Sequence, residues 1–69
     1  MSQEIRDIIA NNVKKLRTKK RLKREELSLI LGFDNSYISK LEKCKINISI
    51  DTLEKIANKL NIQIIDLLR

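Results

Sequence analysis

Apolar residues recur at every third or fourth position along most of this chain, the spacing that places them on one face of a helix. The longest stripe of this kind contains Ile5, Ile9, Val13 and Leu16. Shorter stripes follow it to the C-terminal end. The pattern predicts an all-α fold, a compact bundle of five helices without strands, at residues 3–20, 24–31, 35–43, 50–60 and 64–68.

Polar residues at the expected helix ends support these boundaries. Ser2, Asp34 and Ser49 precede the first, third and fourth helices, where a side-chain oxygen can accept a hydrogen bond from a free backbone N–H. Asn61 follows the fourth helix and is suited to a left-handed stop. The second helix starts atypically, because Lys23 cannot accept such a bond.

The only glycine, Gly32, lies between two short predicted helices. Its simplest role is an ordinary helix C-cap with positive φ. The alternative is a sharp turn that fixes the angle between the helices, and the small residue Ser28 favours it because the helices must approach closely there. The spacing over residues 24–43 predicts a helix-turn-helix, whose first helix supports the second in the major groove of DNA.

Positive charge is concentrated in one part of the chain. Fifteen basic and nine acidic residues give a net charge of +6, and residues 14–24 contain eight of the basic residues and no acidic one. Such a cluster indicates a polyanionic partner, although a solvated helix face is the alternative. Next to a helix-turn-helix, it supports DNA binding.

Composition restricts the other possibilities. One glycine and no proline give no sign of a linker, so we expect one domain over residues 1–69. The apolar runs are too short to span a membrane, and the N-terminal segment does not resemble a secretory signal, so we expect a cytoplasmic protein. With Cys44 alone and no histidine, we expect no disulfide, metal site, cofactor or catalytic centre, and Cys44 is expected to be a plain thiol.

The polar face of the third predicted helix is the main candidate for base recognition. Asn35 can pair with adenine, Ser36 and Ser39 can donate or accept hydrogen bonds, and Lys40 can reach guanine. Tyr37 is expected to contact a thymine methyl group or a phosphate. A polar solvated face is the alternative for any one of them. The absence of acidic residues from 35 to 41 favours DNA for the set.

Basic and polar residues at the edges of the helix pair are expected to contact backbone phosphates and thereby position the protein. Lys23, Arg24 and Lys43 flank the two helices, and Lys45 and Asn47 lie in the loop that follows.

Two further sets of residues leave alternatives open. Arg17 and Glu42 are either a salt bridge between the first and third helices or two unrelated surface charges. The C-terminal segment has more apolar residues than a short helix is expected to bury. These residues either close the core or form a symmetric dimer contact, which we favour. The dimer candidates are Ile62, Ile64, Ile65 and Leu68.

Three segments together resemble the Cro/repressor type of helix-turn-helix domain, the XRE family: REELSLILGFDNSYISKLEK, ISIDTLEKIANKLNI and IIDLL. The resemblance covers residues 12–68 and implies a phage repressor-like, five-helix domain that binds operator DNA as a homodimer and regulates transcription. It implies that Arg24 and Asn35 stand where glutamines often contact phosphate and bases. It also implies a buried Arg17–Glu42 pair and a dimer contact through the last helix. Within the family, the recognition segment is most similar to restriction–modification controller proteins.

The chain departs from the family pattern at three places. Lys23 and Arg24 replace the usual Ser/Thr-Gln start of the second helix, which predicts a more salt-sensitive phosphate contact. Cys44 replaces a frequent glycine, so the loop after the third helix is expected to turn differently. Ser28 replaces the more common alanine, a change that we expect to be harmless.

These observations predict a regulator that binds a palindromic double-stranded operator as a homodimer, without a membrane or small-molecule partner. The alternative is a protein-binding module of the antitoxin or anti-repressor type, whose basic face meets an acidic partner. An enzyme is disfavoured, because the catalytic groups are absent from the sequence.

Overall fold

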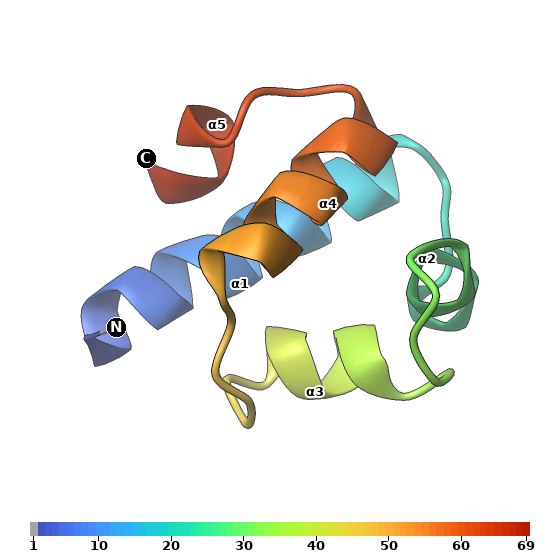
Figure 1. Ribbon diagram of the computed structural model, residues 1–69, viewed down its shortest axis with the longest axis horizontal. Coiled ribbons are helices and arrows are strands. Elements are labelled where there is room, and N and C mark those ends of the chain that lie inside the picture. Colours follow the sequence, from blue (N-terminus) through green and yellow to red (C-terminus); the bar gives the residue numbers. More distant parts are fainter. Residues whose placement is uncertain (1) are drawn as a thin grey trace.

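The computed structural model describes residues 2–69, and this part of the chain contains helices and no strand (Figure 1). The all-α prediction is therefore confirmed. The helices are α1 (Gln3–Lys19), α2 (Arg24–Ile30), α3 (Tyr37–Glu42), α4 (Ile50–Leu60) and α5 (Ile65–Leu68).

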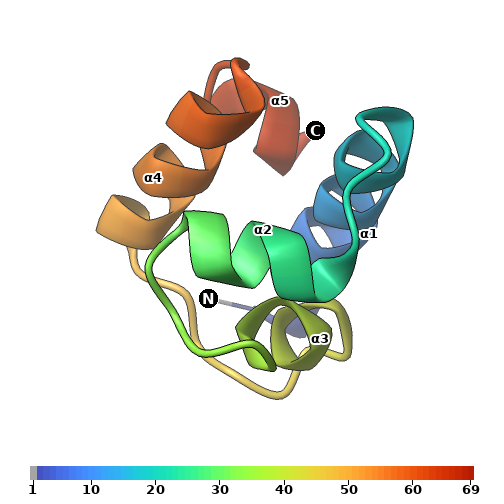
Figure 2. The same cartoon turned by 90° about the vertical axis from the view of Figure 1, so that its right-hand side faces the viewer.

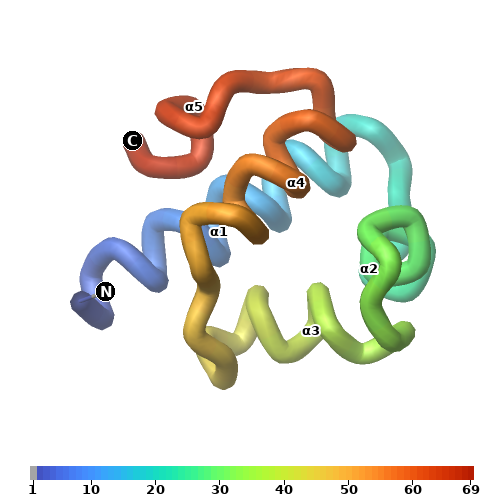
Figure 3. The backbone as a smooth tube through the Cα atoms, viewed as in Figure 1, coloured from blue at the N-terminus to red at the C-terminus, as the bar shows by residue number. Residues whose placement is uncertain are grey.

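The backbone forms a bundle in which α1 is the central support (Figure 3). The longest helix, α1, packs against α3 on one side and against α5 on another. Asn12 anchors α5, because its side-chain amide donates hydrogen bonds to the backbone oxygens of Leu67 and Arg69. The helix α2 packs against α3.

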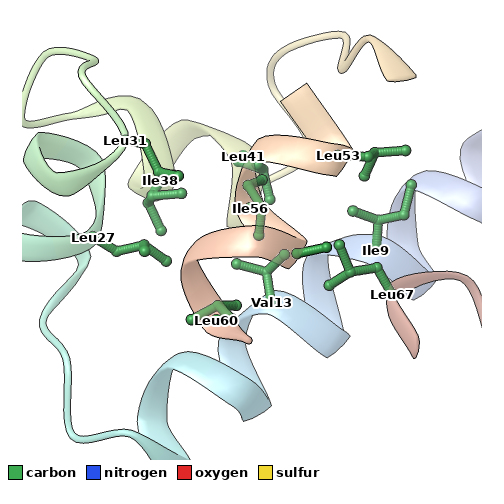
Figure 4. Packing of buried hydrophobic residues seen from close by; sticks show 11 residues of the cluster. Ile9, Val13, Leu27, Leu31, Ile38, Leu41, Leu53, Ile56, Leu60 and Leu67 are labelled. Carbon is green, nitrogen blue, oxygen red and sulfur yellow. The ribbon is translucent and has the colours of Figure 1, made fainter. Parts of the chain in front are cut away.

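One hydrophobic core joins all five helices (Figure 4). Ile9 and Val13 of α1 and Leu60 of α4 have no exposed surface. The periodic apolar positions of the sequence supply nearly all of this core. The other fully or almost fully buried members are Leu27, Leu31, Ile38, Leu41, Leu53, Ile56, Ala57 and Leu67.

Several helix ends follow the sequence prediction. The hydroxyl groups of Ser2 and Ser49 accept hydrogen bonds from the backbone N–H groups of Ile5 and Thr52, respectively. Asn61 ends α4 in the left-handed conformation at φ 57°. Gly32 has φ 84°, which is the positive value expected after α2.

Four helices are shorter than the pattern predicts. In α1, α2 and α5 the difference is one residue at one end, where helix termini commonly form looser turns. The larger correction concerns α3, which begins at Tyr37 rather than at residue 35 and ends at Glu42. Asp34 does not cap this helix. Its Oδ1 instead accepts hydrogen bonds from the backbone N–H and hydroxyl of Ser36, which holds residues 34–36 in a turn.

The candidate DNA interface

The two helices of the motif cross steeply, with α3 seen nearly end-on below α2 in Figure 2 and lengthwise in Figure 1. Leu27 of α2, Leu31 just after this helix, and Ile38 and Leu41 of α3 are buried between the two helices and the rest of the core. Because the apolar side of α3 faces inward, Ser39 and Lys40 are left partly or fully at the surface.

The predicted base-contacting residues occupy two different kinds of backbone. Asn35 and Ser36 lie in the turn before α3, where Asn35 is exposed and Ser36 is half-buried. Ser39 and Lys40 lie on α3 itself, half-buried and exposed, respectively. The segment expected to face DNA is therefore a turn followed by a helix, rather than one continuous helix.

Tyr37 packs against the protein more closely than the sequence suggests. Its ring stacks on the Phe33 ring, with centroids 4.0 Å apart and planes 18° from parallel. The ammonium group of Lys55 lies 4.9 Å from the Phe33 centroid, in a cation–π arrangement. One face of the Tyr37 ring is therefore occupied within the protein.

An open hollow of about 490 Å³ lies between the beginnings of α2 and α3. It brings together residues that are far apart in the sequence, from α1, the start of α2, the turn before α3, and α3 itself. Three cationic side chains and one carboxylate line it together with an amide and two hydroxyl groups, so its lining has a net positive charge. The lining residues are Arg17, Lys23, Arg24, Glu25, Asn35, Ser36 and Ser39.

The remaining predicted phosphate contacts lie at the far end of α3. Lys43 and Lys45 are exposed there. Asn47 is also exposed, but its side-chain oxygen accepts a hydrogen bond from Arg6 of α1. This oxygen therefore already has a partner inside the protein.

The Arg17 and Glu42 side chains form an ion pair between α1 and α3, with Arg17 Nε 2.8 Å from Glu42 Oε2. Only 12% and 5% of these side chains are exposed. Arg17 also donates a hydrogen bond of 2.7 Å from Nη1 to the backbone oxygen of Leu22. One guanidinium group thus connects α1, α3 and the link that leads into α2.

The turn before α3 carries a negative charge that is held within the protein. The hydroxyl and the backbone N–H of Ser36 both donate to Asp34, and these bonds lower the pKa of its carboxyl below the ordinary value of 3.8. The positive charge of Lys40 acts in the same direction. The carboxylate therefore stays ionised and stabilises the turn.

Ser28 is a residue whose importance the sequence interpretation missed. The side chain is fully buried, and its Oγ accepts a hydrogen bond of 2.9 Å from the backbone N–H of Ile38. A polar residue at an expected close contact of two helices is a signal for such a bond, because buried hydroxyl groups are almost always paired.

The loop after α3 also differs from the expectation. Cys44 has φ 59°, in the left-handed region that glycine adopts easily, so the loop turns there as it would with glycine. Its thiol donates a hydrogen bond to Asp7 Oδ1 at 3.3 Å. This bond, with a smaller contribution from burial, raises the pKa of the Cys44 thiol.

The predicted dimer residues are only partly covered. Ile62, Ile64 and Leu68 are half-buried against the core, while Ile65 is 50% exposed. Leu67 is the member of this segment that is fully buried.

Two broader features concern residues 2–69 as a whole. In this part of the chain, no helix combines the length and apolar character needed to cross a bilayer. Nor does it contain a group of three or more carboxylate, thiol or imidazole side chains arranged to hold a metal ion.

Comparison with known proteins identifies relatives that match nearly the whole length of this chain. A hypothetical transcription factor of Neisseria meningitidis serogroup B is 33% identical over 66 residues, which are 96% of this chain and 62% of that protein. The chain thus spans less than two thirds of this relative. The solved structure of a hypothetical Neisseria transcription factor matches with a TM-score of 0.92 at 33% identity, covering 97% of this chain and 77% of that one.

Two further relatives are restriction–modification controllers. The control protein C.SmaI of Serratia marcescens is 34% identical over 65 residues, which cover 94% of this chain and 77% of that protein. The structure of the controller protein C.AhdI of Aeromonas hydrophila matches with a TM-score of 0.83 at 31% identity, covering 90% of this chain and 94% of that one.

The family model HTH_3, described as helix-turn-helix, matches residues 13–67, which include the C-terminal part of α1, all of α2, α3 and α4, and most of α5. The chain therefore belongs to the HTH_3 helix-turn-helix family, of the XRE type, and is a DNA-binding transcription regulator related to restriction–modification controller proteins.

Proposed function

We propose that this protein binds a palindromic operator in double-stranded DNA as a homodimer and regulates transcription in the cytoplasm. The observation that carries the proposal is the hollow between α2 and α3, where the cationic start of α2 faces the acid-free segment that begins at Asn35. The controller relatives favour genes of a restriction–modification system as its targets.

Sequence recognition is assigned to the turn before α3 and to the outer side of that helix. The Asn35 amide matches the donor and acceptor pair of adenine, and the exposed Lys40 suits guanine. Ser36 and Ser39 border the same hollow and supply hydroxyl groups. Since the Tyr37 ring stacks on Phe33, we assign its DNA contact to the hydroxyl group rather than to the ring face.

Positioning on the DNA is assigned to cations on both sides of α3. Lys23 and Arg24 lie at the start of α2, and Lys43 and Lys45 lie beyond the end of α3. All four are exposed, as phosphate contacts require. Asn47 is assigned a supporting contact through its amide nitrogen, because its oxygen bonds to Arg6.

Dimerisation is assigned to the C-terminal segment. Ile65 is half exposed, and Ile62, Ile64 and Leu68 are incompletely covered by the core. Pairing two copies through this apolar surface would remove it from water and would give the two-fold symmetry that a palindromic operator requires.

Selection of bound sequences from random duplex DNA tests the proposal. We expect two half-sites related by a two-fold axis, with centres about 34 Å apart. Asn35→Ala should relax the preference at particular base pairs and cost on the order of 1–3 kcal/mol of specific binding. Selection of no common motif would refute sequence-specific recognition, and failure to bind any duplex at low salt would favour the protein-binding alternative.

The salt dependence of binding separates the two kinds of contact. Lys43→Ala should weaken binding to all duplexes and lower the slope of log affinity against log salt by about one unit. Asn35→Ala provides the matched control, because loss of an uncharged base contact should leave that slope unchanged.

Ile65→Asp should give a monomer in analytical ultracentrifugation. If it stays dimeric, the assigned interface is wrong.

A further inference from the structure

The hydroxyl of Ser28 connects the two helices of the motif through a buried polar contact. It donates a hydrogen bond of 2.8 Å to the backbone oxygen of Arg24, one turn earlier in α2. It accepts one of 2.9 Å from the backbone N–H of Ile38 in α3. The directions of these bonds are compatible, because a hydroxyl donates one hydrogen and has free lone pairs for the second contact.

This contact supplies what the start of α3 lacks. The residue before the helix, Ser36, makes no side-chain capping bond, and its hydroxyl donates to Asp34 instead. The N–H of Ile38 belongs to the first turn of α3, where backbone donors have no partner within the helix. Ser28 therefore acts as the cap of α3, although it belongs to α2 and precedes Ile38 by ten residues.

The same residue also holds the turn between the helices. The backbone oxygen of Ser28 accepts a hydrogen bond of 3.0 Å from the N–H of Phe33, just after Gly32. With six residues, α3 is too short to be stable alone, so external contacts must fix its first turn. Ser28 thus fixes the chain on both sides of residues 34–37, the segment that contains Asn35.

We propose that Ser28 is a positioning residue for DNA recognition: its hydroxyl fixes the first turn of α3 on α2 and thereby the placement of Asn35 and Ser39. This inference rests on the proposed sequence-specific binding. It revises the expectation that serine here is equivalent to alanine, because alanine would leave the buried N–H of Ile38 without an acceptor.

Two variants and a matched control test the proposal. Ser28→Ala and Ser28→Cys remove the strong acceptor, and the cysteine keeps a side chain of similar shape. Ile9→Val is the control, because it weakens the core at a fully buried position of α1 distant from Ile38 (Figure 4). All proteins are measured well below their melting temperatures, so that each is folded.

The first readout is amide hydrogen exchange. In both Ser28 variants we expect the Ile38 N–H to exchange at least tenfold faster than the change in global stability accounts for. In Ile9→Val the exchange rate of the Ile38 N–H should follow global stability.

The second readout is affinity for the selected operator relative to random duplex. We expect this ratio to fall five- to twentyfold in both Ser28 variants and to remain within twofold in Ile9→Val.

The outcomes distinguish this inference from the proposed function. If the unmodified protein shows no sequence preference, the proposed function fails, and this inference fails with it. If it shows a preference that both Ser28 variants retain, the positioning role alone is refuted. An Ile38 exchange rate that merely follows global unfolding would show that the hydroxyl does not hold the helix start.

Discussion

Replacement of Glu42 by leucine should destabilise the protein strongly, because it would leave the Arg17 guanidinium buried without its counter-charge. Glu42 Oε2 and Oε1 lie 2.8 Å and 3.3 Å from Nε and Nη2 of Arg17. At 12% and 5% exposure, water cannot replace the lost partner. Leucine has a similar volume and a high helix propensity, so the loss of charge is the main change.

The expected magnitude follows from the burial of the pair. Breaking a buried ion pair by removing one partner typically costs about 3–5 kcal/mol. A domain of this length has a total free energy of unfolding of roughly 3–10 kcal/mol. Glu42→Leu should therefore lower the midpoint of urea unfolding markedly, and a large fraction of the protein can unfold at physiological temperature.

The double variant Arg17→Met/Glu42→Leu shows whether the buried charge is the cause. Replacing both partners by apolar residues is often close to neutral, although here the Leu22 oxygen also loses its donor, at a cost of about 1–3 kcal/mol. We expect the double variant to be more stable than Glu42→Leu alone.

The exposed ion pair of Arg69 and Asp66 provides the control, since these side chains are 69% and 39% exposed. Arg69→Ala should change the free energy of unfolding by less than about 1 kcal/mol. Urea denaturation followed by circular dichroism measures all four proteins. A cost below about 1 kcal/mol for Glu42→Leu, or a double variant no more stable than it, would refute the reasoning.

Three further predictions concern the turns on either side of α3. Cys44→Gly should stabilise the protein by roughly 0.5–1 kcal/mol in the same assay, because Cys44 has φ 59° and glycine adopts positive φ without strain. Lys45→Gly is the control. Lys45 has no positive φ, so glycine there should destabilise the protein. The raised pKa of the Cys44 thiol should make its alkylation at pH 8 slower than that of a free cysteine peptide. Asp7→Asn should accelerate the alkylation of Cys44. Equal alkylation rates in the variant and the unmodified protein would contradict the role of Asp7. The pKa of the Asp34 carboxyl should lie below 3.8 in an NMR titration. Its stabilising effect is therefore complete above about pH 5 and is lost as the pH falls through the lowered value. Asp34→Asn should abolish this part of the pH dependence.

Local sequence rules predicted much of the fold. The stripe of Ile9 and Val13 identified the buried side of α1, and the serine, asparagine and glycine signals at residues 49, 61 and 32 identified helix ends. These features depend on neighbours within one or two helical turns, so they can be inferred from spacing alone. The acid-free segment and the adjacent cations were found for the same reason.

The start of α3 could not be predicted in this way. Asp34, Asn35 and Ser36 are all good capping residues, so local preference alone does not choose among them. The choice depends on which backbone N–H donates a hydrogen bond to the hydroxyl oxygen of Ser28, a residue of the preceding helix. The packing of Tyr37 could not be predicted either. Its place in the sequence is on the polar side of the predicted helix, and only the structure shows that the Tyr37 ring stacks on the Phe33 ring.

The contacts around Asn35 bear on how strongly this protein can bind DNA. The turn that contains Asn35 is fixed on one side by the two bonds from Ser36 to Asp34 and on the other by the bond from Ile38 to Ser28. A segment restrained before binding loses less conformational entropy when it meets its partner, so more of the contact energy remains as affinity. The Asp34 carboxylate would repel phosphate if its charge were free, but the hydrogen bonds from Ser36 and the nearby Lys40 partly compensate it. An acidic residue next to the proposed contact surface is therefore compatible with DNA binding, because it orders the turn that carries Asn35.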